Sequence, residues 1–100
     1  IEIGERVTIG HNVVINGNTL ICNDAVIGMG SVLEKNSIIE EGGFVGAKSY
    51  ILENTKVPKG QIYAGNPATF FRNVSSKEKK FFSMGQQIYE KLSEEYLQGN

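Results

Sequence analysis

The chain has a single histidine, the side chain with the widest chemical range near neutral pH. His11 stands two residues after the apolar residue Ile9, in the sequence Ile-Gly-His. A neutral imidazole can bind a metal ion or transfer a proton. A zinc site takes three or four protein ligands, so one histidine cannot complete such a site alone. The residues by themselves favour a surface or interface histidine, with a metal ligand as the alternative.

Length and composition limit what surrounds this histidine. The 100 residues make one small domain, and 10 basic against 11 acidic side chains give a net charge of −1, which argues against a nucleic-acid-binding module. No apolar run exceeds three residues, so we expect no transmembrane segment. The single cysteine, Cys22, cannot form an internal disulfide. Because residue 1 already lies inside a repeating pattern, we expect the C-terminal part of a longer protein.

A six-residue repeat runs without a break from Ile3 to Ala68. The first position of its eleven hexads is aliphatic in ten and Tyr63 in the eleventh, and the fifth is small or β-branched in nine. Neither the helical period of 3.6 nor the strand period of 2 explains this spacing. The pattern predicts a solenoid of short strands. Its first position points into the core, and its fifth also faces inward, near a corner where only a small side chain fits.

The hexads resemble those of the left-handed parallel β-helix of hexapeptide-repeat proteins, in which three hexads make one triangular coil. The resemblance implies an all-β solenoid over residues 1–74, with further coils before it, and places residues 18 apart on top of one another. Three core columns are therefore expected: Ile3, Ile21, Ile39 and Val57; Ile9, Ile27, Val45 and Tyr63; Ile15, Leu33 and Ile51. A stack of this kind needs a cap at its end.

The pattern changes after Val74 and predicts a C-terminal packing α-helix over residues 75–98. Ser75 and Glu78 form a capping box, with Ser75 as the N-cap. Apolar residues then recur at helical spacing: Phe81, Met84, Ile88, Leu92 and Tyr96. This stripe is expected to pack on a face of the β-helix, either its own or a neighbour's.

Several segments together resemble the γ-class carbonic anhydrases. The stretch from Val7 to Gly17, which contains Gly-His, is similar to the metal-binding segment of that family. Ile27-Gly28-Met29-Gly30-Ser31 is similar to a signature one coil later. The ending Ala64-Gly65-Asn66-Pro67-Ala68, followed by Arg72 and a Phe-rich helix, looks most like the mitochondrial branch, whose members are subunits of respiratory complex I.

The resemblance implies a trimer with zinc between subunits, bound by three histidines. His11 matches one of them, whereas Asn16 stands where the family has the second, and the third lies upstream of residue 1. An amide is a poor zinc ligand beside imidazole. The hexad Ile15–Leu20 is also one residue longer than the family segment, which shifts the backbone near the ligands. A homotrimer would then lack ligands, whereas in a mixed trimer His11 could complete a site with a paralogous chain.

Other polar residues are placed by the 18-residue stacking. Asp24 should pair with Arg6 at the surface, and Glu34 should lie above Asn16, near the family's metal position. Met29 should stack on His11 as interface packing. Cys22 is read as a buried or turn thiol rather than a replacement ligand.

Three functions follow from these observations. The first is a γ-carbonic-anhydrase-like structural module of mitochondrial complex I, on the matrix side of the inner membrane. It would be inactive by itself and would form a homotrimer or a heterotrimer with paralogous chains. The second is an active zinc carbonic anhydrase in which His11 completes an intersubunit site. The third is a hexapeptide acyltransferase, which usually interrupts its coils with a histidine-bearing loop that is absent here.

Overall fold

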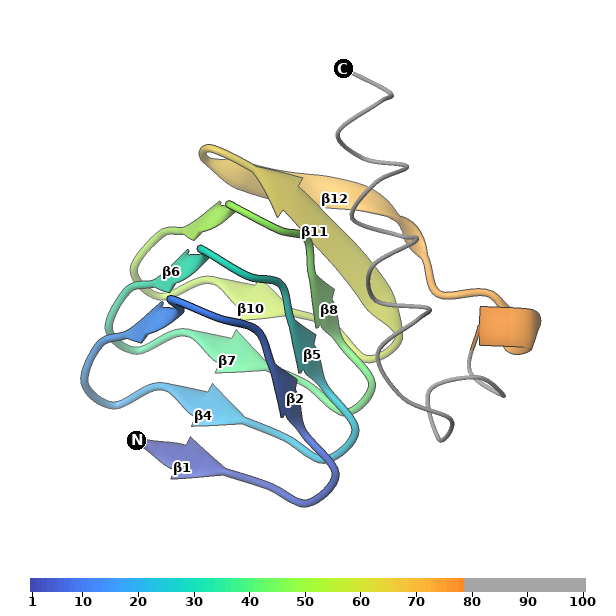
Figure 1. The fold of residues 1–100 in the computed structure, drawn as a ribbon, viewed down its shortest axis with the longest axis horizontal. Coiled ribbons are helices and arrows are strands. Elements are labelled where there is room, and N and C mark those ends of the chain that lie inside the picture. The colour runs from blue at the N-terminus through green and yellow to red at the C-terminus, as the bar shows by residue number, and fades with distance from the viewer. Residues whose placement is uncertain (79–100) are drawn as a thin grey trace.

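The chain winds into a left-handed parallel β-helix, as the resemblance to hexapeptide-repeat proteins implies. The computed structural model describes residues 1–78. Ten two-residue strands form the coils and two longer strands follow them (Figure 1). They are β1 (Glu2–Ile3), β2 (Thr8–Ile9), β3 (Val14–Ile15), β4 (Leu20–Ile21), β5 (Val26–Ile27), β6 (Val32–Leu33), β7 (Ile38–Ile39), β8 (Phe44–Val45), β9 (Tyr50–Ile51), β10 (Lys56–Val57), β11 (Gln61–Gly65) and β12 (Ala68–Asn73).

Three sheets make the three sides of the coil, and all their strand pairs are parallel except β11 with β12. Their strand orders are β1-β4-β7-β10, β2-β5-β8-β11-β12 and β3-β6-β9. Every parallel pair joins residues 18 apart, so Ile9 pairs with Ile27, and Ile27 with Val45. The predicted core columns are therefore confirmed, because residues of one column lie directly above one another.

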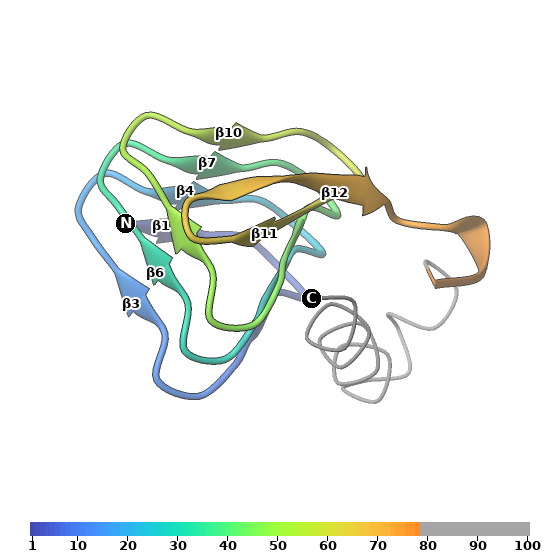
Figure 2. The same cartoon turned by 90° about the horizontal axis from the view of Figure 1, so that it is seen from above.

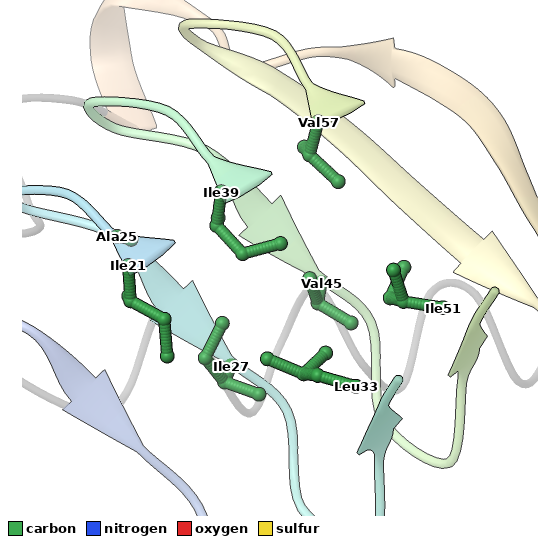
Figure 3. Close-up of a cluster of buried hydrophobic side chains, with 8 residues drawn as sticks. All are labelled: Ile21, Ala25, Ile27, Leu33, Ile39, Val45, Ile51 and Val57. Carbon is green, nitrogen blue, oxygen red and sulfur yellow. The ribbon is translucent and has the colours of Figure 1, made fainter. Parts of the chain in front are cut away.

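The core is the narrow space that the three sheets enclose. Figure 3 shows the first-position side chains pointing into it, and seven of them are fully buried: Ile21, Ile27, Leu33, Ile39, Val45, Ile51 and Val57. The fifth-position residues Ser31 and Ser37 are also buried. Their hydroxyls donate to the carbonyl oxygens of Gly46 at 2.9 Å and Glu34 at 2.8 Å, which satisfies them without water.

The corners need residues that accept a left-handed backbone. At one corner Asn18, Asn36 and Asn54 stack with φ between 61° and 63°. Asparagine tolerates this region better than most residues do, which explains its recurrence every 18 positions. Gly28 is needed for close packing rather than for its backbone conformation, because a Cβ atom there would clash with the backbone of Ala47 on the next coil.

An antiparallel hairpin caps the stack (Figure 2). Strand β11 still pairs in parallel with β8, with Tyr63 beside Val45, but its other edge pairs with β12 in the antiparallel direction. The aromatic rings of Tyr63 and Phe70 meet edge to face at 6.4 Å between centroids. The hairpin thus provides the cap that the sequence requires, with β11 from the last hexads of the repeat and β12 mostly from the residues that follow it.

An ion pair between Arg72 and Glu78, here called the clamp, joins the end of the hairpin to the residues that follow it. The two guanidinium nitrogens of Arg72 donate to the two carboxylate oxygens of Glu78 at 2.8 and 2.9 Å. Glu78 also accepts from the Ser75 amide, while its own amide donates to the Ser75 hydroxyl, so the predicted capping box is confirmed. The rest of the predicted helix, with Phe81 and the residues after it, lies outside the described residues. Within residues 1–78, no helix is long and apolar enough to cross a membrane.

Two neighbouring residues test the inward and outward faces of β10. Val57 is fully buried and Lys56 is exposed on the same strand. Val57→Ala removes two buried methyl groups and should lower the free energy of unfolding by about 2 kcal/mol. Lys56→Ala should change it by less than about 0.5 kcal/mol. Urea denaturation of both variants measures the difference, and equal effects would contradict the assigned faces.

The clamp predicts a pH dependence of stability. The ion pair with Arg72 lowers the pKa of Glu78 from 4.5 to about 2. A carboxyl with a lowered folded-state pKa stabilises the fold above its unfolded pKa, and this stabilisation is lost as the pH falls through the folded pKa. Glu78→Gln should therefore destabilise the protein most above pH 4.5, and the difference from the wild type should fade as the pH falls through about 2. Denaturation across this range checks the prediction, with Glu53→Gln at an exposed carboxylate as the control.

Candidate functional site

His11 lies in the turn between β2 and β3, with its side chain exposed as the sequence predicts. Its carbonyl oxygen accepts a hydrogen bond from the Gly30 amide of the next coil at 2.8 Å. This bond places Met29 and Gly30 above His11 and Asn12 at the same corner. Met29 is 39% exposed, so the corner carries an imidazole with an apolar side chain above it.

Asn16 lies at the other end of β3, and its side chain is engaged. The Asn16 Nδ2 atom donates to Glu34 Oε1 at 2.5 Å. Both side chains are half-buried, and the bond joins two successive coils. The structure therefore brings Glu34 to Asn16, as the 18-residue stacking predicts, and gives the amide hydrogen a carboxylate acceptor.

Glu34 also accepts a hydrogen bond from Tyr50, a residue that the 18-residue stacking does not predict beside it. The Tyr50 hydroxyl donates to Glu34 Oε2, so Asn16, Glu34 and Tyr50 form one network across three coils. The hydrogen bond to Glu34, followed by burial and by the negative charge of Glu34 and Glu53, raises the pKa of Tyr50. Tyr50 lies 16 rather than 18 residues from Glu34, so simple stacking does not place the two side chains together.

Residues 1–78 bring together no group of side chains that could hold a zinc ion. His11 lies in the turn before β3 and Asn16 follows β3 directly, so the two strand residues Val14 and Ile15, at roughly 3.3 Å each, stand between them together with Asn12 and Val13. Two ligands of one zinc ion lie within about 4 Å of each other, since each is about 2 Å from the metal. Among residues 1–78, no three His, Cys, Asp or Glu side chains come together to hold a metal ion.

Cys22 is a free, half-buried thiol that follows β4 on another side of the coil. Burial, followed by the negative charges of Glu40 and Glu41, raises the pKa of this thiol. The side chain therefore stays a neutral thiol at neutral pH, which disfavours both metal binding and nucleophilic attack. Cys22 lines a shallow hollow on the surface together with Glu2 and Lys59.

Arg6 and Asp24 form the predicted surface pair. The Arg6 Nε and Nη2 atoms donate to the two Asp24 carboxylate oxygens at 2.8 and 3.2 Å. This hydrogen-bonded pair raises the pKa of Arg6. Both side chains are well exposed, so the pair links two coils at the surface and contributes little to stability.

The network predicts a measurable shift in tyrosine titration. Glu34→Gln removes the charge that holds the Tyr50 proton, so the pKa of Tyr50 should fall toward its ordinary value of 10.0. Absorbance of tyrosinate against pH measures this value, and Tyr50→Phe identifies which of the four tyrosines is responsible. If Glu34→Gln leaves the titration curve unchanged, the network is absent in solution.

One family model matches the repeat. Residues 1–35 match the model described as bacterial transferase hexapeptide (six repeats). This match covers the first coils, including His11, Asn16 and Glu34. It agrees with the coil geometry, in which each hexad supplies one strand and one corner.

Two solved structures share the fold over nearly the whole chain. A putative acetyltransferase of Bacillus cereus is 30% identical with a TM-score of 0.77, covering 95% of this chain and 55% of its own. A hexapeptide transferase family protein from Anaplasma phagocytophilum is 27% identical with a TM-score of 0.69, covering 96% and 69%.

The curated relatives include two mitochondrial proteins of Arabidopsis thaliana. Gamma carbonic anhydrase 1 is 36% identical over 58 residues, which are 58% of this chain and 21% of that protein. Gamma carbonic anhydrase 2 is 36% identical over 56 residues, which are 56% of this chain and 20% of that protein. The matched stretch thus spans about a fifth of each relative. By repeat, fold and sequence, the chain is a hexapeptide-repeat β-helix that is similar to the mitochondrial γ-class carbonic anhydrases.

Proposed function

We propose that this chain is a γ-carbonic-anhydrase-like subunit that serves as a structural module of a trimer and has no carbonic anhydrase activity by itself. The bond from Asn16 Nδ2 to Glu34 is the observation that carries this proposal. The family's imidazole would offer a nitrogen lone pair at this position. The Asn16 amide offers no such lone pair, and it directs its N–H group to a neighbouring carboxylate.

The proposed loss of activity follows from ligand chemistry. An amide binds zinc poorly compared with imidazole, thiolate or carboxylate. His11 is exposed, and it is the position within residues 1–78 where this chain keeps a histidine that the family uses as a ligand. In a homotrimer each interface would hold His11 without a second histidine at position 16. In a mixed trimer, a paralogous chain could supply the missing ligands, and zinc would then be held only at those interfaces.

The proposed location is the mitochondrion, in respiratory complex I on the matrix side of the inner membrane. Both curated relatives carry the word mitochondrial in their names. The segment Ala64–Ala68, with Arg72 after it, adds the resemblance to the complex I branch. In this setting the chain would contribute a rigid, trimeric β-helix to a larger assembly rather than a reaction.

An active carbonic anhydrase is the second candidate, because His11 is retained where the family has a zinc ligand. This candidate needs two further ligands from outside residues 1–78. It predicts carbon dioxide hydration that disappears in His11→Ala. Activity that is unaffected by this substitution would exclude it.

An acyltransferase is the third candidate, because both solved structures described above are named as transferases. The hexads of this chain run without the inserted loop that such enzymes use to present a histidine. Tight binding of acetyl coenzyme A to the purified chain would favour this function over the structural one.

Metal analysis tests the proposed function directly. The purified homotrimer should contain no stoichiometric zinc after dialysis, because position 16 supplies no competent ligand. The measurement is elemental analysis of the wild type, with His11→Ala as the matched control for weak surface binding. One tightly held zinc per interface in the wild type, lost in His11→Ala, would contradict the proposal and support an active enzyme.

A further inference from the structure

The outer surface of the sheet β3-β6-β9 combines apolar and anionic side chains. Because side chains alternate along a strand, Val14, Val32 and Tyr50 share this face with Asn16, Glu34 and Leu52. Val14 and Leu52 are each 50% exposed, so both contribute apolar surface to this face. Glu34 lies between them in the middle coil. We call these six residues the outer face.

The charge of Glu34 lacks a cation within the described chain. Its two oxygens accept hydrogen bonds from neutral donors, Asn16 and Tyr50. Other carboxylates differ: Asp24 pairs with Arg6, and Glu78 with Arg72. Among residues 1–78, no Lys, Arg or His side chain forms an ion pair with Glu34. A half-buried carboxylate beside exposed aliphatic groups favours a partner that brings a positive charge and apolar surface.

A different part of the same chain has the complementary character. The corner between the sheets β2-β5-β8 and β3-β6-β9 carries His11, Met29 and Lys48 on three successive coils. Lys48 is exposed and forms no ion pair with the described residues, and its Cγ lies over Gly30. Met29 adds apolar surface, at 39% exposed. We call these three residues the corner patch.

The outer face and the corner patch have the same spacing along the coil axis, because the same stacked coils form both. The Gly30 amide donates to the His11 carbonyl at 2.8 Å, and the Lys48 amide to the Met29 carbonyl at 2.7 Å. On the outer face, the Asn16 amide donates to Leu33 and the Glu34 amide to Ile51, both at 2.9 Å. Every coil therefore contributes to both surfaces. Two copies with parallel axes bring them level, and a lysine side chain spans the roughly 4.8 Å between coils.

We infer that the outer face of one copy receives the corner patch of the next, with Lys48 of the second copy placed beside Glu34 of the first. This inference rests on the trimer of the proposed function and assigns its contact residues. A contact between two different surfaces is heterologous, and it forms a closed ring when the rotation between copies closes. The three-sided coil presents such surfaces at an angle to each other, which favours a ring over a filament.

Charge substitutions test the contact. Light scattering after gel filtration should give a trimer for the wild type and a threefold lower mass for Lys48→Glu, which places like charges together. Glu34→Lys should have the same effect. The double variant Glu34→Lys with Lys48→Glu restores opposite charges at every interface and should recover the trimer. Glu41→Lys, at an exposed acid on another corner, is the matched control and should stay trimeric.

The outcomes separate this inference from the proposed function. A trimeric wild type whose mass is unchanged in Lys48→Glu overturns the inference and leaves the trimer intact. Failure of the double variant to reassociate, while it keeps the circular dichroism of the wild type, also overturns it. A monomeric wild type overturns the trimer itself, and a partner other than a second copy must then cover the outer face. Lys48→Glu is decisive if Glu34→Lys fails to fold, because Lys48 is exposed and has no partner in the described chain.

Discussion

Stacking of identical positions between successive coils is the constraint on which this structure depends. A two-residue strand has no stability alone, so each coil relies on the backbone hydrogen bonds and buried side chains of the coils beside it. Ile27 serves both neighbours at once, because it pairs with Ile9 below and Val45 above. One residue inserted into a hexad would turn every later side chain away from its column. The inward positions are restricted to apolar or small side chains, so the polar side chains that can bind or react lie at the outward positions.

The sequence predicts this architecture well because the repeat is one-dimensional. The columns, the pairing of Arg6 with Asp24 and the approach of Glu34 to Asn16 all follow from counting 18 residues. The terminal hairpin does not follow in the same way. Tyr63 still pairs with Val45 as a column member, and only the unsuitable fifth-position residues Gln61 and Pro67 signal that the coil ends. The repeat predicts where the coil ends, but it does not predict that the chain then turns back as an antiparallel strand.

The candidate site shows the same limit at the level of side chains. The substitution at position 16 is visible in the sequence, but the fate of its amide hydrogen is not. A half-buried carboxylate needs donors, and Glu34 takes one from Asn16 and one from Tyr50, which approaches diagonally across the sheet. Diagonal contacts depend on side-chain length and tilt, which no repeat encodes. The network gives the three outward residues a role in joining coils.

The antiparallel hairpin has a consequence for self-association along the coil axis. An uncapped β-helix ends in unpaired backbone groups that match the next coil of another molecule, as in the growth of cross-β fibrils. Here β11 uses both of its edges, one on β8 and one on β12. A second molecule therefore finds no parallel template on β11 at this end. The hairpin therefore blocks end-to-end pairing on one of the three sides of the last coil, whereas β9 and β10 end their own sheets.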